Sequence, residues 1–291
     1  MKTAFLLLCH KNPEQINILL QKLLECDCDI YVHIDLKNND IRSEISNNNR
    51  ISILNEKDSY SIEWGGVTMI QATLSLINAV YNSSKKYDYL CLLSGQDFPI
   101  RSMKDYQLLL DGNNFIEVIE RNTKDYDQYK KRCELHYPVW INNKSVFIKA
   151  VKRLYMLITG GYSYTFPILR RKKTFSFEFE FGSQWWCLTY ECAMYMLEYC
   201  KIHPEYIDFF KTVIVPDECF FQILFMASPF RNTQKNNLTY INWNRKINRR
   251  SPLIFTNKDF DLLQKISENF CFARKFDINI DSPIVERLSK L

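Results

Sequence analysis

TAFLLLC at residues 3–9 and DIYVHID at residues 29–35 are apolar runs that predict two buried strands. The Asn12–Pro13 pair between them opens a helix, because a proline in the first turn loses only an N–H that would be unpaired anyway. The apolar residues that follow have the spacing of one helical face: Ile16, Leu19, Leu20, Leu23 and Leu24. The stretch therefore predicts a β-α-β unit with parallel strands.

The same alternation continues along the first third of the chain. Residues 51–54 predict a short third strand, residues 67–77 an amphipathic helix, and residues 87–93 (YDYLCLL) a further strand. We therefore expect an α/β fold, with a mostly parallel sheet flanked by helices. Ligands bind outside the carboxyl ends of the strands in such sheets, so His10, Asp35 and the turn at 94–97 should line one crevice.

The second half of the chain is less regular. A polar stretch (122–136) and a basic, aromatic stretch (144–173) precede two expected helices at 189–201 and 205–213. No internal repeat appears, and no segment is rich enough in Gly, Ser or Pro to separate domains. We expect residues 1–291 to form one continuous domain.

Composition is that of a folded protein. Hydrophobic residues make up 46% of the chain and aromatic residues 14%, which is ample for one large core, and the 24% charged fraction argues against disorder. The net charge of +5 suits an anionic substrate or a membrane surface, although so mild an excess is common.

The ten cysteines have no metal-ligand spacing. Cys26 and Cys28 are the only close pair, and neither a second pair nor a histidine cluster completes a zinc site. Several others lie inside apolar runs, where a free thiol packs as a small hydrophobe: Cys9, Cys91, Cys187 and Cys192. Reduced, buried thiols favour a cytoplasmic protein, as does the lack of a signal peptide or of an apolar run of ~18 residues.

Seven short segments carry the functional information, in this order: VHID (32–35), EWGG (63–66), LSGQDFPI (93–100), GSQWW (182–186), PDECFF (216–221), NWNRK (242–246) and FARKFD (272–277). Together they resemble glycosyltransferase family 14, the core-2/I-branching β-1,6-N-acetylglucosaminyltransferases and peptide O-xylosyltransferases. The resemblance runs from Phe5 to Asp277 and implies a GT-A-type single domain with a Rossmann-like sheet. It also implies a UDP-sugar donor, inversion at the anomeric carbon and no divalent metal.

The resemblance divides the domain by task. Residues from about 1 to 120 would form the nucleotide-binding half, and residues from about 121 to 291 the acceptor-binding and catalytic half. Cofactors other than the donor substrate are not expected.

Glu218 in the PDECFF segment is the expected catalytic residue. Transfer to a hydroxyl requires removal of its proton, which a positioned carboxylate accelerates by ~10²–10⁴-fold, and in the family the glutamate of this motif is the base. The alternative is that Asp217 and Glu218 only stabilise a helix N-terminus, where anions are favoured. Both interpretations can hold, with Asp217 as the structural partner.

Three residues are expected on the donor side. Asp35 could accept hydrogen bonds from uracil or ribose, or could simply cap the next turn. Trp64 precedes two glycines that let the backbone approach a ligand closely. Asp97 stands where metal-dependent GT-A enzymes place two carboxylates for Mn²⁺ or Mg²⁺; a single one does not hold a hard dication, so we expect it to accept a sugar or ribose hydroxyl.

Without a metal, basic side chains must neutralise the departing diphosphate. Arg250 and Lys275 match the positions where family members place two such residues, and Arg245 is a reserve candidate beside Lys246. The neighbouring Arg249 and Arg274 are expected on a solvated face.

The resemblance places four residues on the sugar substrates: Glu117, Gln184, Trp185 and Trp243. Because side chains alternate along a strand, only one of Trp185 and Trp186 should face the cleft. The stretch 124–132 departs from the acceptor-binding pattern of the N-acetylglucosaminyl branch, and NWNRK favours the xylosyl branch. We expect the donor to carry GlcNAc or xylose.

Residues 147–173 combine apolar and aromatic residues with lysines and arginines, a composition that suits an anionic membrane surface and equally suits an ordinary helix with exposed lysines. No nucleic-acid partner is indicated. The chain lacks the anchor and disulfides of animal family members and is rich in Ile, Lys and Asn, so we expect a bacterial enzyme. Its acceptor would be a surface glycan or a lipid-linked oligosaccharide, and its location the cytoplasm or the inner face of the cell membrane.

Two other functions remain open at this point. A binding protein could keep the sugar-nucleotide pocket without turnover. A glycoside hydrolase would need a second carboxylate about 5–10 Å from Glu218, for which Glu117 is a candidate.

Overall fold

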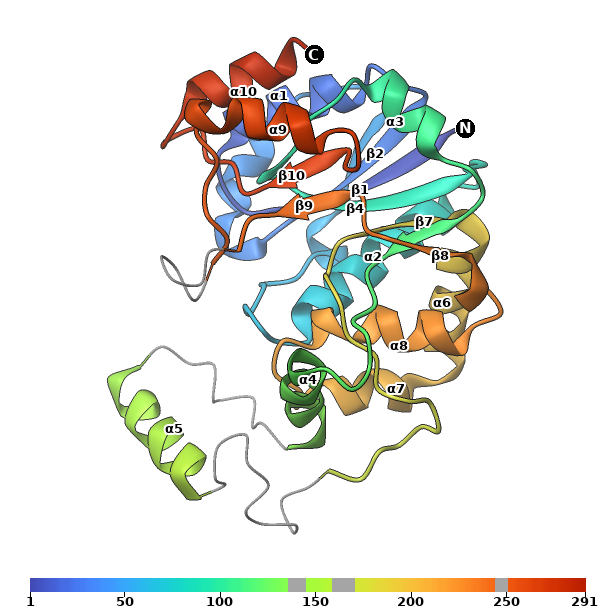
Figure 1. The fold of residues 1–291 in the computed structure, drawn as a ribbon, viewed down its shortest axis with the longest axis vertical. Coiled ribbons are helices and arrows are strands. Elements are labelled where there is room, and N and C mark those ends of the chain that lie inside the picture. The colour runs from blue at the N-terminus through green and yellow to red at the C-terminus, as the bar shows by residue number, and fades with distance from the viewer. Residues whose placement is uncertain (136–144, 159–170, 244–250) are drawn as a thin grey trace.

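The computed structural model describes residues 1–135, 145–158, 171–243 and 251–291. Within these residues the main sheet has seven strands in the order β3-β2-β1-β4-β7-β6-β8. Their bounds are β1 Thr3–Cys9, β2 Cys28–Ile34, β3 Ile51–Ile53, β4 Tyr89–Ser94, β6 Asn114–Ile116, β7 Trp186–Thr189 and β8 Gln234–Lys235. Figure 1 shows the sheet in the centre of the molecule.

The strands of the first half run parallel, as predicted. β1 pairs in parallel with β2 and β4, and β2 pairs in parallel with β3. β7 comes from the second half of the chain and is antiparallel to both of its neighbours, β4 and β6, while β8 runs parallel to β6. The prediction of a mostly parallel α/β sheet flanked by helices is confirmed.

Side-chain alternation on β1 explains why helices cover both faces. Ala4, Leu6 and Leu8 belong to one buried apolar cluster, together with α2 (Thr68–Asn82), α6 (Tyr190–Ile202), α7 (Pro204–Phe210) and α8 (Phe220–Ala227). Phe5, Leu7 and Cys9 belong to the other, together with α1 (Pro13–Leu23), α3 (Met103–Leu109), α9 (Phe260–Ile266) and α10 (Ser282–Ser289). A strand buried on both faces reads as a continuous apolar run, which is why TAFLLLC was recognisable.

A smaller sheet joins the end of the chain to the turn after β4. Its order is β5-β10-β9, with β5 at Asp97–Pro99, β10 at Phe272–Arg274 and β9 at Thr239–Ile241. β10 is antiparallel to β5 and parallel to β9, and Arg274 lies opposite Asp97 in the register. This sheet brings the FARKFD segment to the carboxyl end of β4.

The polar stretch 122–136 contains a helix, α4 (Lys124–Glu134). Thr123 caps its amino end, because the Thr123 side chain accepts the Tyr126 N–H at 3.1 Å. A further helix, α5 (Val146–Ile158), stands apart from the sheet in Figure 1. Short 3₁₀ turns complete the described elements: Leu36–Glu44, Glu56–Asp58, Pro216–Glu218, Arg231–Thr233 and Asn257–Asp259. None of the described helices is long and apolar enough to span a bilayer.

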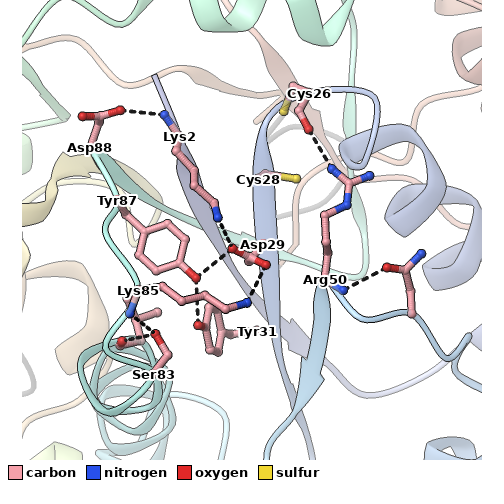
Figure 2. Close-up of polar contacts among 12 residues, drawn as sticks. Lys2, Cys26, Cys28, Asp29, Tyr31, Arg50, Ser83, Lys85, Tyr87 and Asp88 are labelled. Carbon is pink, nitrogen blue, oxygen red and sulfur yellow. Dashed lines mark hydrogen bonds and ion pairs between the residues drawn. The ribbon is translucent and has the colours of Figure 1, made fainter.

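A charge network around the buried Asp29 holds the amino ends of β1, β2 and β4 together (Figure 2). Asp29 forms ion pairs of 2.8 Å with both Lys2 and Lys85 and accepts the Tyr87 hydroxyl at 2.9 Å. Tyr31 and Tyr87 share a further hydroxyl contact of 2.9 Å. Because Asp29 is buried, these partners compensate the cost of its desolvation. The network stabilises the end of the sheet that lies opposite the carboxyl ends of β1, β2 and β4.

All ten cysteines are free and buried, as expected from the apolar runs around them. Burial raises the pKa of Cys9 to about 12 and of Cys200 to about 12, so both thiols stay protonated near neutral pH.

Candidate active site

The carboxyl ends of β1, β2 and β4 meet at one edge of the sheet. The Asp35 N–H donates to the Cys9 carbonyl at 2.9 Å, and the Gly95 N–H donates to the Leu8 carbonyl at 3.1 Å. His10 lies at the same edge with its side chain exposed; partial desolvation by the surrounding protein lowers its pKa first, the charges of Lys11 and Lys275 lower it further, and Asp35 opposes them. The three strand ends therefore come together as the sequence predicted.

Asp35 is buried, and its carboxylate serves the backbone. One oxygen, Oδ1, accepts the N–H groups of Lys37 at 3.0 Å and Ile62 at 3.1 Å. The first bond caps the turn that follows β2, and the second fixes the loop that carries the EWGG segment. The capping alternative is thus present in the fold, and the donor-binding role of Asp35 stays a prediction.

The EWGG loop reaches the turn that holds Glu218. Gly65 adopts a φ of 73°, which favours glycine, and its carbonyl accepts the Val215 N–H at 2.9 Å. Trp64, directly before it, has 73% of its surface exposed. The loop therefore presents an uncovered aromatic side chain beside the Glu218 turn.

Glu218 ends a tight turn with an unusual backbone. Val215 has a φ of 53°, a region that a β-branched residue rarely adopts and that costs of order 1–3 kcal/mol. Pro216 to Glu218 then form one 3₁₀ turn, in which Asp217 is buried and Glu218 is partly exposed. Within the described residues the Oδ1 atom of Asp217 has no hydrogen-bond partner. Burial, and then the charge of Glu218, raise the pKa of Asp217 to about 7.

Two further segments fix Glu218. Its carbonyl accepts the Gly182 N–H at 2.9 Å, and its Oε2 accepts Nη1 of Arg132 at 2.7 Å. A side chain at Gly182 would meet the Glu117 carbonyl at 1.9 Å, so only glycine allows this approach. Arg132, from α4, was not predicted as a site residue.

The GSQWW segment also carries predicted acceptor residues. The Glu117 carboxylate accepts the Ser183 N–H at 3.0 Å, and partial desolvation by the surrounding protein raises its pKa although the residue is exposed on one side. In the described part of the chain, Nε2 of Gln184 is buried and lacks a hydrogen-bond partner. The Glu117 backbone lies against Gly182, and Gln184 follows Gly182 by two residues, while the contacts of both side chains with a sugar stay predictions.

Trp185 connects the same segment to the cations of FARKFD. Trp185 is 6% exposed, and the Arg274 guanidinium lies 4.2 Å from its ring centroid. Trp186 is buried in the core against Phe221. Both tryptophans are buried in the same apolar cluster, so the expectation that only one of them faces the cleft stays a prediction; the ring of Trp185 is covered by an arginine and little of it is open to a sugar.

Arg274 and Asp97 form a buried ion pair, which corrects two expectations. Nη1 of Arg274 donates to Oδ1 of Asp97 at 2.9 Å and to the Ser94 hydroxyl at 3.2 Å, and Oδ2 of Asp97 accepts the Ser94 N–H at 2.6 Å. Arg274 is therefore not on a solvated face. Asp97 is fully buried, so its carboxylate is covered by protein and not open to a sugar or ribose hydroxyl. Burial raises the pKa of Asp97 and lowers that of Arg274, and their mutual attraction opposes both shifts.

Lys275 follows Arg274 and is half-buried at the strand ends. Its carbonyl accepts the Phe255 N–H at 2.9 Å, which anchors the backbone. Burial lowers the pKa of Lys275, and the positive charges of Arg274 and Lys11 lower it further. Lys11 itself is ion-paired with Asp277. A cluster of cations thus lies beside His10, where an anion would relieve their mutual repulsion.

The other predicted residues are less well placed. Trp243 has 47% of its surface exposed at the end of the described segment. Arg245 and Arg250 lie outside the described residues. A cavity of about 370 Å³ lies between β3 and α2, lined by residues such as Ser52, Asn55 and Asn78, and no candidate residue borders it.

Across residues 1–135, 145–158, 171–243 and 251–291, no three His, Cys, Asp or Glu side chains are grouped so that they could hold a metal ion. The strand-end carboxylate that metal-dependent GT-A enzymes would use, Asp97, is committed to Arg274.

A chain of contacts thus joins the separate sequence segments. Asp35 bonds to Ile62, Gly65 to Val215, Glu218 to Gly182, and Trp185 contacts Arg274, which pairs with Asp97. The arrangement sets a partly exposed carboxylate on one side and a cluster of cations on the other.

The chain is similar to known glycosyltransferases over nearly its whole length. A family model described as "Branch: Core-2/I-Branching enzyme" matches residues 3–264. Xylosyltransferase sqv-6 of Caenorhabditis briggsae is 26% identical over 98% of this chain and 36% of its own length. Xylosyltransferase 2 of Rattus norvegicus is 22% identical over 99% of this chain and 33% of its own length. The chain therefore spans about a third of the length of these relatives.

Among solved structures, apo mouse xyloside xylosyltransferase 1 is similar over 94% of this chain and 97% of that chain. The sequence identity is 10% and the TM-score is 0.38, which is too distant to support a conclusion about this chain.

Proposed function

The chain belongs to the core-2/I-branching enzyme family of glycosyltransferases, and from this premise we propose that it transfers a sugar from a UDP-sugar to a hydroxyl of a glycan acceptor. The transfer inverts the anomeric carbon, needs no metal and uses Glu218 as general base. The observation that carries this proposal is the position of Glu218: a partly exposed carboxylate at the end of a strained turn, held by contacts from three other segments.

In the proposed reaction the acceptor oxygen attacks the anomeric carbon while its proton moves to the Glu218 carboxylate. The bond from that carbon to the β-phosphate oxygen breaks, and UDP leaves with the electron pair. Glu218 then releases the proton to solvent. A single displacement of this kind inverts the anomeric centre, and the base supplies ~10²–10⁴-fold of the acceleration.

The negative charge that grows on UDP needs cations, and Lys275 is the best-placed candidate. It is half-buried beside Arg274 and Lys11, at the carboxyl ends of the strands where α/β sheets bind ligands. We assign Arg250 to the same task and keep Arg245 as its reserve, on the family resemblance. Arg274 contributes its charge while Asp97 and Trp185 hold it in place.

The donor sugar is proposed to be xylose, with GlcNAc second. The NWNRK segment favours the xylosyl branch, and the relatives named above are xylosyltransferases. Asp35 and Trp64 are assigned to the donor, and Glu117, Gln184, Trp185 and Trp243 to the sugars on the acceptor side.

A donor screen tests this function. Thermal-shift measurements with UDP-xylose, UDP-GlcNAc, UDP-galactose and UDP-glucose should single out UDP-xylose or UDP-GlcNAc, because a ligand that binds only the folded state at 100 times its Kd adds about 2.7 kcal/mol of stability. Incubation with that donor and a panel of glycans should release UDP and extend one glycan by the mass of one sugar.

Other outcomes identify the alternatives. Donor binding without UDP release would show a sugar-nucleotide-binding protein. Cleavage of a glycan without any UDP-sugar would show a glycoside hydrolase. Either result contradicts glycosyl transfer.

The acceptor is proposed to lie at a membrane, on a surface glycan or lipid-linked oligosaccharide of a bacterial cell, with the protein peripheral on the inner face. Helix α5 supports this. Phe147, Leu154 and Ile158 are exposed on one face and Lys149 and Arg153 on another, and the exposed Leu157, one turn after Arg153, lies between the two. Apolar residues can enter the interface of a bilayer while the basic ones meet anionic headgroups. The rest of the predicted segment at 159–170 lies outside the described residues.

We expect the protein to co-sediment with vesicles that contain phosphatidylglycerol and to be released as salt rises, since the Debye length falls from ~30 Å at 0.01 M to ~3 Å at 1 M. The double variant Leu154→Asp/Leu157→Asp should bind at least ~10-fold more weakly, because each buried leucine contributes about 1.5–3 kcal/mol.

Leu108→Asp is the control, since Leu108 is an exposed leucine on α3, with 75% of its surface uncovered against 58% for Leu154 and 72% for Leu157. Equal binding to neutral vesicles, or no binding at all, contradicts the membrane contact. So does an equal loss in the control variant.

A further inference from the structure

Among the residues that the structure describes, Arg132 makes a close charged contact to the proposed base. Its Nη1 lies 2.7 Å from Oε2 of Glu218, and each side chain keeps only about a quarter of its surface exposed (27% and 26%). We propose that Arg132 is a positioning residue for the reaction, which keeps the Glu218 carboxylate ionised and correctly oriented until the acceptor hydroxyl arrives. This inference rests on the proposed function, because it concerns the same base.

The protein holds Arg132 from its other side. The guanidinium lies 4.2 Å from the centroid of the Tyr129 ring, one turn earlier in α4, and Tyr129 stacks on Phe181 at 5.6 Å. Phe181 directly precedes Gly182, whose N–H bonds to the Glu218 carbonyl. The arginine is therefore supported by the same segment that fixes the backbone of the base.

A second pair of side chains fixes α4 to the turn. Cys133 and Cys219 are both buried with their sulfur atoms 3.6 Å apart, and they directly follow Arg132 and Glu218 in the sequence. Two neighbouring contacts, 132 to 218 and 133 to 219, thus set the position of the helix relative to the turn. An exposed surface ion pair usually lacks such support and contributes little.

The electrostatics explain why an arginine is needed here. Asp217 and Glu218 are adjacent carboxyls, and two such groups in a poorly solvated place favour sharing one proton. Burial and the charge of Glu218 raise the pKa of Asp217 to about 7, while Arg132 lowers it. The positive charge of Arg132 therefore favours the state in which the carboxylates are ionised, and a base must be ionised to accept a proton.

Other titratable groups face this turn from the elements packed against it. They contribute charge or polarity around the turn: Cys133 from α4, Arg171 from the segment after α5, Glu117, whose backbone lies against Gly182, and Asp217 and Cys219 from the turn itself. Among the side chains that the structure describes, Arg132 is the one whose cation contacts the carboxylate.

The test compares Arg132→Gln, Arg132→Lys and the control Lys130→Gln. Lys130 lies on the same helix but faces Glu134, at 3.8 Å, and keeps 44% of its side chain exposed. Arg132→Gln should lower kcat by about 10-fold or more at pH 7 with UDP affinity unchanged. Arg132→Lys should recover most of that loss, and Lys130→Gln should match the wild type.

The pH profile of kcat distinguishes an electrostatic role of Arg132 from a purely structural one. Loss of the cation favours the protonated carboxyl, so the acidic limb of kcat in Arg132→Gln should move to higher pH, by roughly one unit or more. The deficit should be larger at about pH 6 than at about pH 9. An Arg132→Gln deficit that is equal at all pH values, or a normal kcat, contradicts the inference.

A double variant keeps the inference and the proposed function distinguishable. In a Glu218→Gln background there is no base left to position, so adding Arg132→Gln should change kcat by less than about 2-fold. If the two residues acted independently, their separate fold-reductions of kcat would multiply. If Glu218→Gln alone leaves turnover normal, the proposed base is wrong. If Glu218→Gln is inactive while Arg132→Gln is normal, only the role of Arg132 is wrong.

Discussion

Replacing Glu218 with glutamine is expected to slow sugar transfer by at least ~10²-fold while leaving the affinity for UDP almost unchanged. Glutamine keeps the size of the side chain and can still accept the Arg132 hydrogen bond through its amide oxygen. It cannot take a proton from the acceptor. The effect should therefore appear in kcat, measured as UDP release at saturating donor, rather than in binding.

Glu63→Gln is a suitable control for this variant. Glu63 is an exposed carboxylate on the EWGG loop, whose backbone touches the Glu218 turn through Gly65. Its turnover should stay within about 2-fold of wild type, since exposed substitutions usually have small effects. A Glu218→Gln protein with near-normal turnover removes the proposed mechanism.

Activity is expected to survive excess EDTA, and Lys275→Ala is expected to weaken UDP binding by roughly 10–10²-fold, the size of a charged hydrogen bond of about 1.5–3 kcal/mol. The reason is the distribution of charge. Asp97 is fully buried in its pair with Arg274, and Lys275 lies half-buried at the strand ends. Arg250→Ala should weaken UDP binding as well, and added Mn²⁺ should not raise the untreated rate.

The matched control for Lys275→Ala is Lys258→Ala, which removes an exposed lysine from the turn before α9. Calorimetric titration with UDP gives the affinities, and assays with EDTA and then Mn²⁺ give the metal response. If EDTA abolishes the activity and Mn²⁺ restores it, the charge on UDP is balanced by a dication and the assignment to Lys275 and Arg250 is wrong.

The sheet could be predicted well because its strands are buried on both faces. TAFLLLC matches β1 residue for residue, and YDYLCLL differs from β4 by two residues at the start and one at the end. The prediction missed α4, since its sequence, KDYDQYKKRCE, has few apolar residues to show a periodic stripe. It also missed the smaller sheet, whose three-residue strands come from distant parts of the chain. One continuous domain over residues 1–291 stays a prediction.

Some candidate site residues belong to recognisable motifs, and others are identified only by contacts between distant parts of the chain. Motifs single out Glu218, Gln184 and Glu117, and the backbone around Gly182 brings these segments together, while their roles stay predictions. The buried position of Arg274 could not be predicted, because a basic run usually marks a solvated surface. Only the pairing of β10 with β5 places Arg274 opposite Asp97. Arg132 gave no sequence signal either: its contact with Glu218 joins residues 86 positions apart.

The configuration of the first product tests the central claim most directly. UDP-xylose and UDP-GlcNAc carry the sugar in the α configuration, and a single displacement with Glu218 as base must give a β-linked product. Proton NMR of the anomeric signal in the first glycan formed, or in the first free sugar when only water is present, should therefore show the β anomer. An α product would mean that the anomeric centre is retained, which contradicts direct displacement and the role of Glu218.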